Sequence, residues 1–143
     1  MNIIQSPSPN FGERRGYLPE MIVIHCTDGN SPSDLAWLRN PVSQVSSHYY
    51  IAPNGQVHQL VQDDKSAWAN GRINNPSAKL KLVNGVYVNP NYYTLSIETS
   101  LKATDEISGP QYDSLLLLVS QLSEKYDIRP DRDHIVGHRE IYS

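Results

Sequence analysis

Residues 21–26 have the sequence MIVIHC, an unbroken apolar run that ends in a histidine and a cysteine. Such a run is typical of a central strand covered on both faces, because a strand with one face in water alternates apolar and polar residues. The chain must therefore supply a layer on each side of a sheet. Its 143 residues are about the size of one domain, which buries roughly two-thirds of its unfolded surface in a single core.

The rest of the chain alternates strand and helix patterns. Apolar residues recur at three- and four-residue steps over residues 110–126, which predicts an amphipathic helix. Segments 47–52 and 56–61 predict a hairpin, because the Asn-Gly pair between them tolerates the positive φ angles of a tight turn. Further strands are expected at 92–99 and 134–138. We therefore predict an α/β fold with a mixed central β-sheet flanked by helices.

A short helix is predicted from Ser31 to Leu38. Ser31 is expected to cap its free N–H groups, Pro32 suits the first helical position, and Asp34 favours the positive end of the helix dipole. Two other segments carry no sustained period. Residues 1–19 are predicted to form an extended arm over the domain, and residues 70–91 a long surface excursion of the kind that is often functional.

Composition narrows the possible partners. The 12 Lys+Arg and 15 Asp+Glu residues form no long run of one sign, so we expect no nucleic-acid partner. A single cysteine, Cys26, excludes an internal disulfide framework. No segment approaches 18 apolar residues, and the N-terminus lacks the pattern of a signal peptide. We expect a monomer that is made in the cytoplasm and has no membrane partner.

Three segments stand in order along the chain: 22–27 (IVIHCT), 46–59 (SSHYYIAPNGQVHQ) and 135–141 (IVGHREI). Taken together they resemble the zinc-dependent N-acetylmuramoyl-L-alanine amidases that cut bacterial peptidoglycan, a family that also includes animal peptidoglycan recognition proteins. Leu95-Ser-Ile-Glu98 matches the family's carboxylate strand, and Ala67-Trp68 matches a loop on the substrate side. The resemblance therefore covers most of the chain and identifies residues 1–143 as an amidase catalytic domain.

The resemblance implies a hydrolytic zinc site. His25 and His138 would bind Zn²⁺, and Glu98 would be the catalytic acid/base. Such sites use three protein ligands and keep a fourth position for water. The implied substrate is the N-acetylmuramoyl–L-alanine amide of peptidoglycan, cut by a phage or prophage endolysin that reaches the wall after phage-type release. The alternatives are a peptidoglycan-binding module without activity and a cytoplasmic amidase that recycles muropeptides.

Further residues of the matching segments are candidates for supporting roles. Trp68 and Tyr49 are predicted to pack against the sugar or peptide of the substrate, and His48 to hydrogen-bond beneath the metal ligands. Several family members have a catalytic tyrosine where this chain has Ser47, which leaves the acid/base role to Glu98.

Two residues beside the predicted ligands admit other interpretations. Adjacent strand residues face opposite sides, so Cys26 is predicted to be buried in the core, while a cysteine nucleophile with a histidine base stays open. His134 and His138 have the spacing of a helical metalloprotease pair but lack the glutamate after the first histidine. On a strand they would lie about 13 Å apart, so we take His134 as structural.

The third zinc ligand of the family is an Asp or Cys roughly eight residues after the second histidine. This chain ends at Ser143, five residues after His138. Glu140 is the nearest downstream carboxylate and would lie about 6–7 Å along a continuing strand, which makes it a poor ligand. We therefore expect the natural protein to continue past Ser143 and to carry the ligand there.

Overall fold

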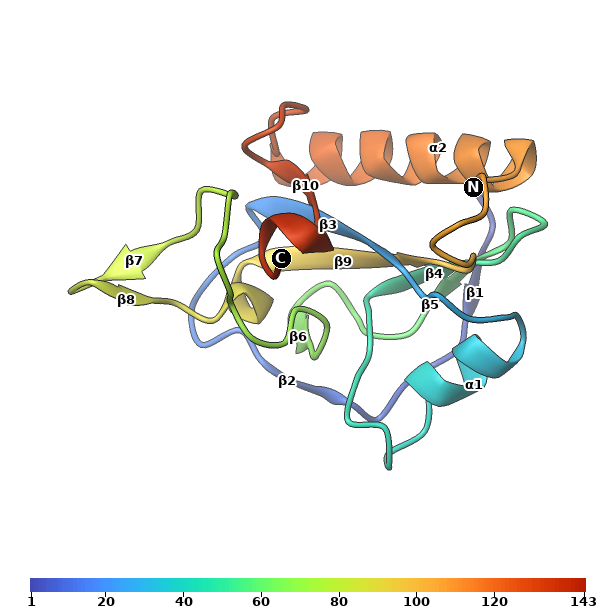
Figure 1. Ribbon diagram of the computed structural model, residues 1–143, viewed down its shortest axis with the longest axis horizontal. Helices are drawn as coiled ribbons and strands as arrows, with labels where there is room; N and C mark the ends of the chain where they lie inside the picture. The colour runs from blue at the N-terminus through green and yellow to red at the C-terminus, as the bar shows by residue number, and fades with distance from the viewer.

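A six-stranded mixed sheet forms the centre of the protein, for which a computed structural model describes residues 1–143 (Figure 1). Its strand order is β1-β5-β4-β9-β3-β10. Strands β4, β9, β3 and β10 run parallel to one another, whereas β5 is antiparallel to β4 and β1 runs parallel to β5. This arrangement confirms the predicted mixed sheet. The strands are β1 (Ile3–Gln5), β3 (Met21–Cys26), β4 (Tyr49–Ile51), β5 (Val57–Gln59), β9 (Thr94–Thr99) and β10 (Ile135–Gly137).

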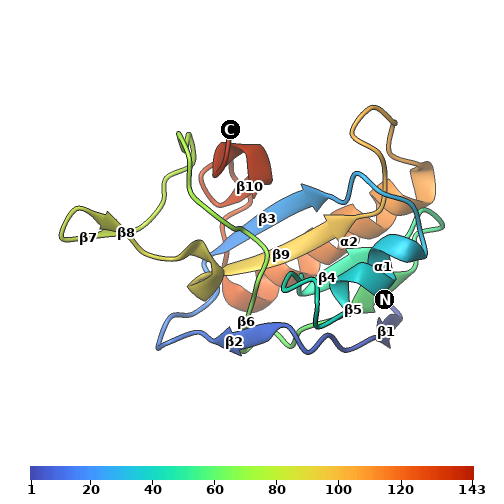
Figure 2. The same ribbon diagram turned by 60° about the horizontal axis from the view of Figure 1, so that its bottom comes forward.

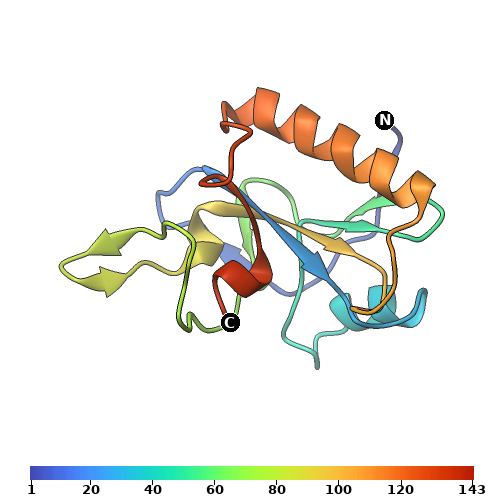
Figure 3. The same ribbon diagram turned by 45° about the horizontal axis from the view of Figure 1, so that its top comes forward.

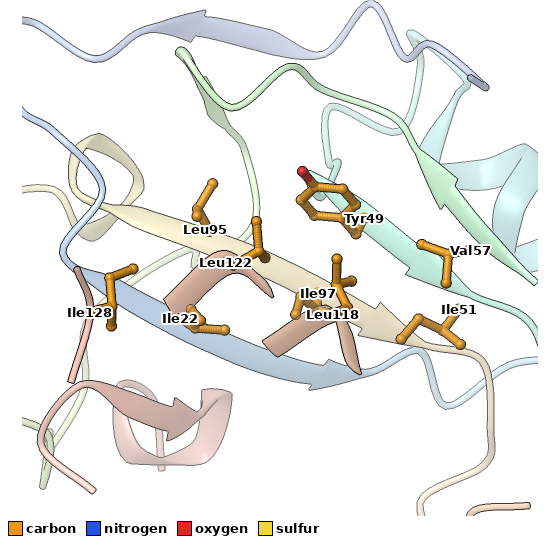
Figure 4. Packing of buried hydrophobic residues seen from close by; sticks show 9 residues of the cluster. All are labelled: Ile22, Tyr49, Ile51, Val57, Leu95, Ile97, Leu118, Leu122 and Ile128. Atoms are coloured by element: carbon orange, nitrogen blue, oxygen red, sulfur yellow. The ribbon is translucent and has the colours of Figure 1, made fainter. Parts of the chain in front are cut away.

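One face of the sheet is covered by the long helix α2 (Gly109–Tyr126), as Figures 1 and 3 show. The Ser108 hydroxyl accepts a hydrogen bond from the Gln111 N–H and so caps the helix start. Neither this helix nor any other is long and apolar enough to cross a membrane. Each large apolar side chain buried beneath it stabilises the fold by about 1.5–3 kcal/mol. The buried cluster in this layer consists of Ile22, Tyr49, Ile51, Val57, Leu95, Ile97, Leu118, Leu122 and Ile128 (Figure 4).

The opposite face is covered by short elements from several parts of the chain (Figure 2). Helix α1 (Ser33–Leu38) begins one residue later than predicted, with Pro32 and not Ser31 at the cap position: Ser31 makes no capping bond, and the Asp34 N–H donates to the Asn30 carbonyl instead. The other elements on this face include the two-stranded sheet of β2 (Phe11–Glu13) and β6 (Lys65–Ala67) and the 3₁₀ helix η2 (His138–Glu140).

The N-terminal arm is more regular than predicted. Within residues 1–19, β1 pairs with β5 of the central sheet and β2 pairs with β6. The arm is also tied down by Arg14, whose buried guanidinium donates to the backbone carbonyls of Asp63, Tyr92 and Thr94. These pairings join segments about 50 to 80 residues apart, so the local composition of the arm carried no sign of them.

The predicted surface excursion over residues 70–91 contains a small hairpin. Its strands are β7 (Leu82–Val83) and β8 (Val86–Tyr87), followed by the 3₁₀ helix η1 (Pro90–Tyr92). The hairpin projects from the body of the protein in all three ribbon views (Figures 1–3). The excursion also carries Asn70, which lies beside the candidate site.

The predicted β4–β5 hairpin is confirmed, and its turn gives a test of packing. Gly55 has a φ of +87°, and a Cβ atom there would lie 2.7 Å from the Pro110 carbonyl oxygen. We expect Gly55→Ala to lower the free energy of unfolding by about 1–3 kcal/mol, measured by urea unfolding. Gly85→Ala is the matched control, because Gly85 has a φ of +76° but no atom within 4 Å of its Cβ position. Equal losses in the two variants would show that the Pro110 contact has no effect.

Candidate metal and catalytic site

Three adjacent parallel strands bring His25, Glu98 and His138 together. In the β3–β9 register His25 lies opposite Glu98, and in the β3–β10 register Gly137 lies opposite Ile24, which places His138 next to His25. The imidazole rings of His25 and His138 have centroids 4.6 Å apart, and His25 Nδ1 lies 3.9 Å from Glu98 Oε1. Strand alternation points these side chains away from α2. The three residues selected from the sequence therefore occupy one place in the fold.

The three side chains line a cleft of about 240 Å³. Trp37 from α1 and Trp68 after β6 also line it, and they are 53% and 39% exposed. Trp68, the predicted substrate contact, thus lies in the wall of this cleft, together with Trp37, which was not among the residues predicted from the sequence. Exposed tryptophans and buried polar groups thus line the same cleft.

Burial favours the uncharged forms of the His25 imidazole and the Glu98 carboxyl group. Burial, and next the neighbouring His138, lower the pKa of His25 to about 3. Burial, and next Asp34, raise the pKa of Glu98 to about 8. Near pH 7 the imidazole is therefore neutral and the carboxyl group is mostly protonated, so their 3.9 Å contact is not an ion pair. A neutral imidazole is the form that binds metal, and a carboxyl group with a pKa near 8 is suited to proton transfer near neutral pH.

The hydrogen bond of His138 defines which of its ring nitrogens is free. His138 Nε2 lies 2.9 Å from the backbone carbonyl oxygen of Asn70, which can only accept, so Nε2 carries the proton. The Nδ1 lone pair is then available to a ligand. Histidines that bind metals are usually held in this way, with the second nitrogen donating to a carbonyl or carboxylate. His25 and His138 thus fit two of the three protein ligands of a hydrolytic zinc site.

No third ligand stands beside the two histidines. The structure contains no group of three or more His, Cys, Asp or Glu side chains that could hold a metal ion. Glu140 is engaged elsewhere: its Oε2 accepts hydrogen bonds from the Gly137 N–H and the Arg132 guanidinium, both at 2.7 Å. The sequence-based judgement that Glu140 is a poor ligand agrees with this position.

Asp34 is a residue of the site that the sequence analysis missed. Its carboxylate accepts hydrogen bonds from the hydroxyl groups of Thr27, Tyr50 and Ser100, and its charge contributes to the raised pKa of Glu98. The sequence suggested only a favourable position in the first turn of a helix. The partners of Asp34 lie 7, 16 and 66 residues away, so no local pattern could reveal the cluster.

Tyr49 does not belong to the site, which corrects the prediction of a substrate contact. It pairs with Ile97, is buried in the cluster beneath α2, and donates its hydroxyl hydrogen bond to Asp63. Its neighbour Tyr50 pairs with Glu98 and lies on the other face. Two adjacent tyrosines on a strand must face opposite sides, and the sequence did not show which of them faces the cleft.

His48 is buried and hydrogen-bonded as predicted, but not to the metal ligands. Its Nδ1 accepts from the Ser96 N–H, and its Nε2 lies 2.8 Å from the Lys65 carbonyl oxygen. No hydrogen bond joins it to His25, Glu98 or His138. His48 therefore links strands of the scaffold and does not orient the ligands directly, which corrects its predicted role.

Cys26 and His134 are the two residues for which the sequence admitted other interpretations. Cys26 is exposed, which corrects the predicted burial, because this last residue of β3 lines the cleft of His25, Glu98 and His138 as well as a second, open cleft. Its thiol donates to the Leu101 carbonyl, and partial burial is the main cause that raises its pKa, so the thiolate needed for nucleophilic attack is disfavoured. His134 hydrogen-bonds to Asp131 at 2.6 Å, in keeping with a structural role.

Comparison with known proteins places this arrangement in a family. Residues 15–143 match the family described as N-acetylmuramoyl-L-alanine amidase. The chain is 33% identical over 85 residues to N-acetylmuramoyl-L-alanine amidase A of Achromobacter lyticus, covering 59% of this chain and 38% of that protein. It is 25% identical over 136 residues to the endolysin PlyTW of Staphylococcus phage Twort, covering 90% of this chain and 26% of the endolysin. The chain thus spans well under half of these relatives.

Solved structures share the fold. A selenomethionine derivative of AmpD superposes with a TM-score of 0.76 at 23% identity, covering 98% of this chain and 83% of AmpD. The amidase AmiD from E. coli, in complex with the substrate anhydro-N-acetylmuramic acid-L-Ala-D-γ-Glu-L-Lys, superposes with a TM-score of 0.69 at 24% identity, covering 92% and 58%. At these identities the likeness concerns the fold. Because the family match extends over almost the whole chain, this protein belongs to the N-acetylmuramoyl-L-alanine amidase family.

Proposed function

We propose that this protein hydrolyses the amide bond between N-acetylmuramic acid and L-alanine in peptidoglycan, with Zn²⁺ held by His25 and His138. The observation that carries the proposal is the meeting of His25, Glu98 and His138 in one cleft at the ends of three adjacent strands. Bound zinc would supply a polarised substrate carbonyl and a water molecule of lowered pKa. Proton transfer and contact with the substrate are proposed for the protein's own side chains.

Glu98 is proposed to move the proton. As a carboxylate it would take a proton from the attacking water, whose oxygen bonds to the lactyl carbonyl carbon. It would then give that proton to the alanine nitrogen as the C–N bond breaks, leaving a muramic acid carboxyl group and a free amino terminus. The raised pKa of Glu98, caused first by burial and then by Asp34, supports this role because the group can hold the proton between the two steps.

The cleft walls are proposed to contact the substrate. Trp37 and Trp68 offer exposed aromatic surface in the cleft that His25, Glu98 and His138 also line. Aromatic side chains contribute large apolar contact area to binding sites. We infer that these two residues pack against the sugar or the first residues of the peptide stem.

The biological setting we propose is that of a phage or prophage endolysin that acts on the wall after phage-type release. Its support is the similarity to the endolysin PlyTW over 90% of the chain. Recycling of soluble muropeptides is the alternative setting; it is favoured by the shared fold with AmiD, whose structure is a complex with a muropeptide substrate. The two settings differ in substrate, because an endolysin must attack intact walls.

The deciding experiment measures newly exposed N-terminal alanine. Purified protein is incubated with intact peptidoglycan sacculi or with soluble muropeptides, with added zinc or with a chelator. We expect alanine release in zinc that the chelator abolishes. Release from soluble fragments only would support recycling, whereas absence of release from either substrate in zinc would contradict the amidase proposal.

A peptidoglycan-binding role without cleavage is the second candidate. It is favoured by one observation: no group of three or more His, Cys, Asp or Glu side chains is arranged so that it could hold a metal ion. The same samples test it when sedimented sacculi are analysed for bound protein. Binding that resists the chelator, together with no alanine release, would establish this role in place of hydrolysis.

A further inference from the structure

Asn70 lies beside His138 and is fully buried, with 0% of its surface exposed. It sits in the loop that follows β6, beside Trp68. Three of its polar groups have partners. The backbone N–H donates to Asn91 Oδ1, the backbone carbonyl faces His138 Nε2, and the side-chain NH₂ donates to the Thr94 hydroxyl, all at 2.9–3.0 Å.

The fourth polar group of Asn70, Oδ1, is buried without a hydrogen bond, and so is Nε2 of His25. A buried acceptor and a buried donor without partners are costly, at roughly 1–3 kcal/mol each. The two groups lie in one buried neighbourhood, because the Asn70 carbonyl contacts His138, whose ring centroid lies 4.6 Å from that of His25. A buried donor and a buried acceptor without other partners complement each other there.

We propose that Asn70 is a positioning residue that holds both histidines by Nε2, His138 through its backbone carbonyl and His25 through its side-chain oxygen. Both imidazoles then carry their proton on Nε2 and present an unprotonated Nδ1 to the cleft. For His25 this direction is visible, because its Nδ1 is the atom that lies 3.9 Å from Glu98. The purpose of these contacts rests on the proposed zinc site, but the contacts themselves belong to the metal-free chain.

Thr94 determines which end of the Asn70 amide faces His25. Because the NH₂ group donates to the Thr94 hydroxyl, the oxygen must point the other way. Thr94 is itself buried at the first position of β9, four residues before Glu98. The strand that carries the proposed acid/base thus also orients the residue that orients His25.

The first test needs no substitution and no zinc. The ¹⁵N and ¹H chemical shifts of the imidazole rings in the metal-free protein report which nitrogen of each histidine is protonated. We expect His25 and His138 both to be protonated on Nε2 near pH 7. Protonation of His25 on Nδ1 would overturn the proposal, whatever the protein does with zinc.

The second test compares substitutions at Asn70. Asn70→Leu removes the oxygen acceptor but keeps the backbone carbonyl, so His25 should become a mixture of tautomers while His138 stays protonated on Nε2. Asn70→Asp keeps an oxygen at the same place and should restore the His25 tautomer. An unchanged His25 signal in Asn70→Leu would refute the proposed contact.

The affinity for zinc tests whether the Asn70 contacts serve metal binding. It is measured by competition of the metal alone against a chromophoric chelator. We expect Asn70→Leu to weaken zinc binding about 10–100-fold, the usual effect of losing such a partner, and Asn70→Asp to recover most of it. Asn10→Leu is the control, because Asn10 is equally buried but its side chain bonds only within residues 40–45. An equal loss in Asn10→Leu would show a general packing effect and contradict positioning. If the native protein binds no zinc but shows the expected tautomers, the zinc proposal fails and the Asn70 contact stands.

Discussion

Replacing Glu98 by Gln is expected to lower kcat by about 10²–10⁴-fold with little change in KM. The substitution keeps the size of a side chain that is 14% exposed, but glutamine cannot accept the proton of water or return it to the amine. Loss in kcat with unchanged KM is the pattern of an interaction made in the transition state. The measurement is alanine release at saturating and limiting muropeptide.

Glu124→Gln is the matched control for Glu98. Glu124 is exposed on α2, on the far side of the sheet from the cleft, and should keep full activity. Activity within threefold of the native protein in Glu98→Gln would rule out Glu98 as the main acid/base group.

Although it loses activity, the same Glu98→Gln variant should gain stability relative to the native metal-free protein as pH rises. The Glu98 pKa is about 8 in the folded state against an ordinary value of 4.5, so between these pH values the folded state keeps a proton that the unfolded state releases. Stability is therefore lost as pH rises from about 4.5 to 8, at up to about 1.4 kcal/mol per pH unit. The variant lacks this loss, so its stability advantage should grow with pH in urea unfolding. An advantage that does not change with pH would show that Glu98 is not held protonated.

Replacing His25 by Ala is expected to abolish both zinc binding and alanine release. With two histidines at the site, removal of one leaves a single imidazole. The affinity loss should therefore exceed the 10–100-fold that follows from losing an outer partner. Equilibrium dialysis against zinc and the alanine assay measure the two effects on the same preparation.

Two substitutions separate this result from the other interpretations of the sequence. His134→Ala should keep zinc binding and activity, because His134 bonds to Asp131 away from the cleft. Cys26→Ser should also remain active, because the raised pKa of the Cys26 thiol and its hydrogen bond to Leu101 disfavour the nucleophilic thiolate. Loss of activity in Cys26→Ser with zinc binding intact would favour a cysteine mechanism instead.

The sequence by itself determined the elements whose signals lie within a few residues. The three- and four-residue apolar period predicted α2, Asn54-Gly55 predicted the β4–β5 turn, and the run at 21–26 predicted the covered strand β3. These patterns are local because helix period, strand alternation and turn conformation each depend on neighbouring residues. The ordered resemblance to the amidases then selected His25, Glu98 and His138, which the fold brings together.

The tertiary structure decided everything that depends on pairing across long separations. It placed Tyr50, and not Tyr49, on the face of the cleft, it built the Asp34 cluster from residues up to 66 positions away, and it set the Asn70 carbonyl against His138. It also paired the N-terminal arm as β1 and β2. Strand register and loop packing bring these groups into contact, and neither is encoded in a local pattern. The sequence therefore determined which residues could carry the chemistry, and the tertiary contacts determined how they are held.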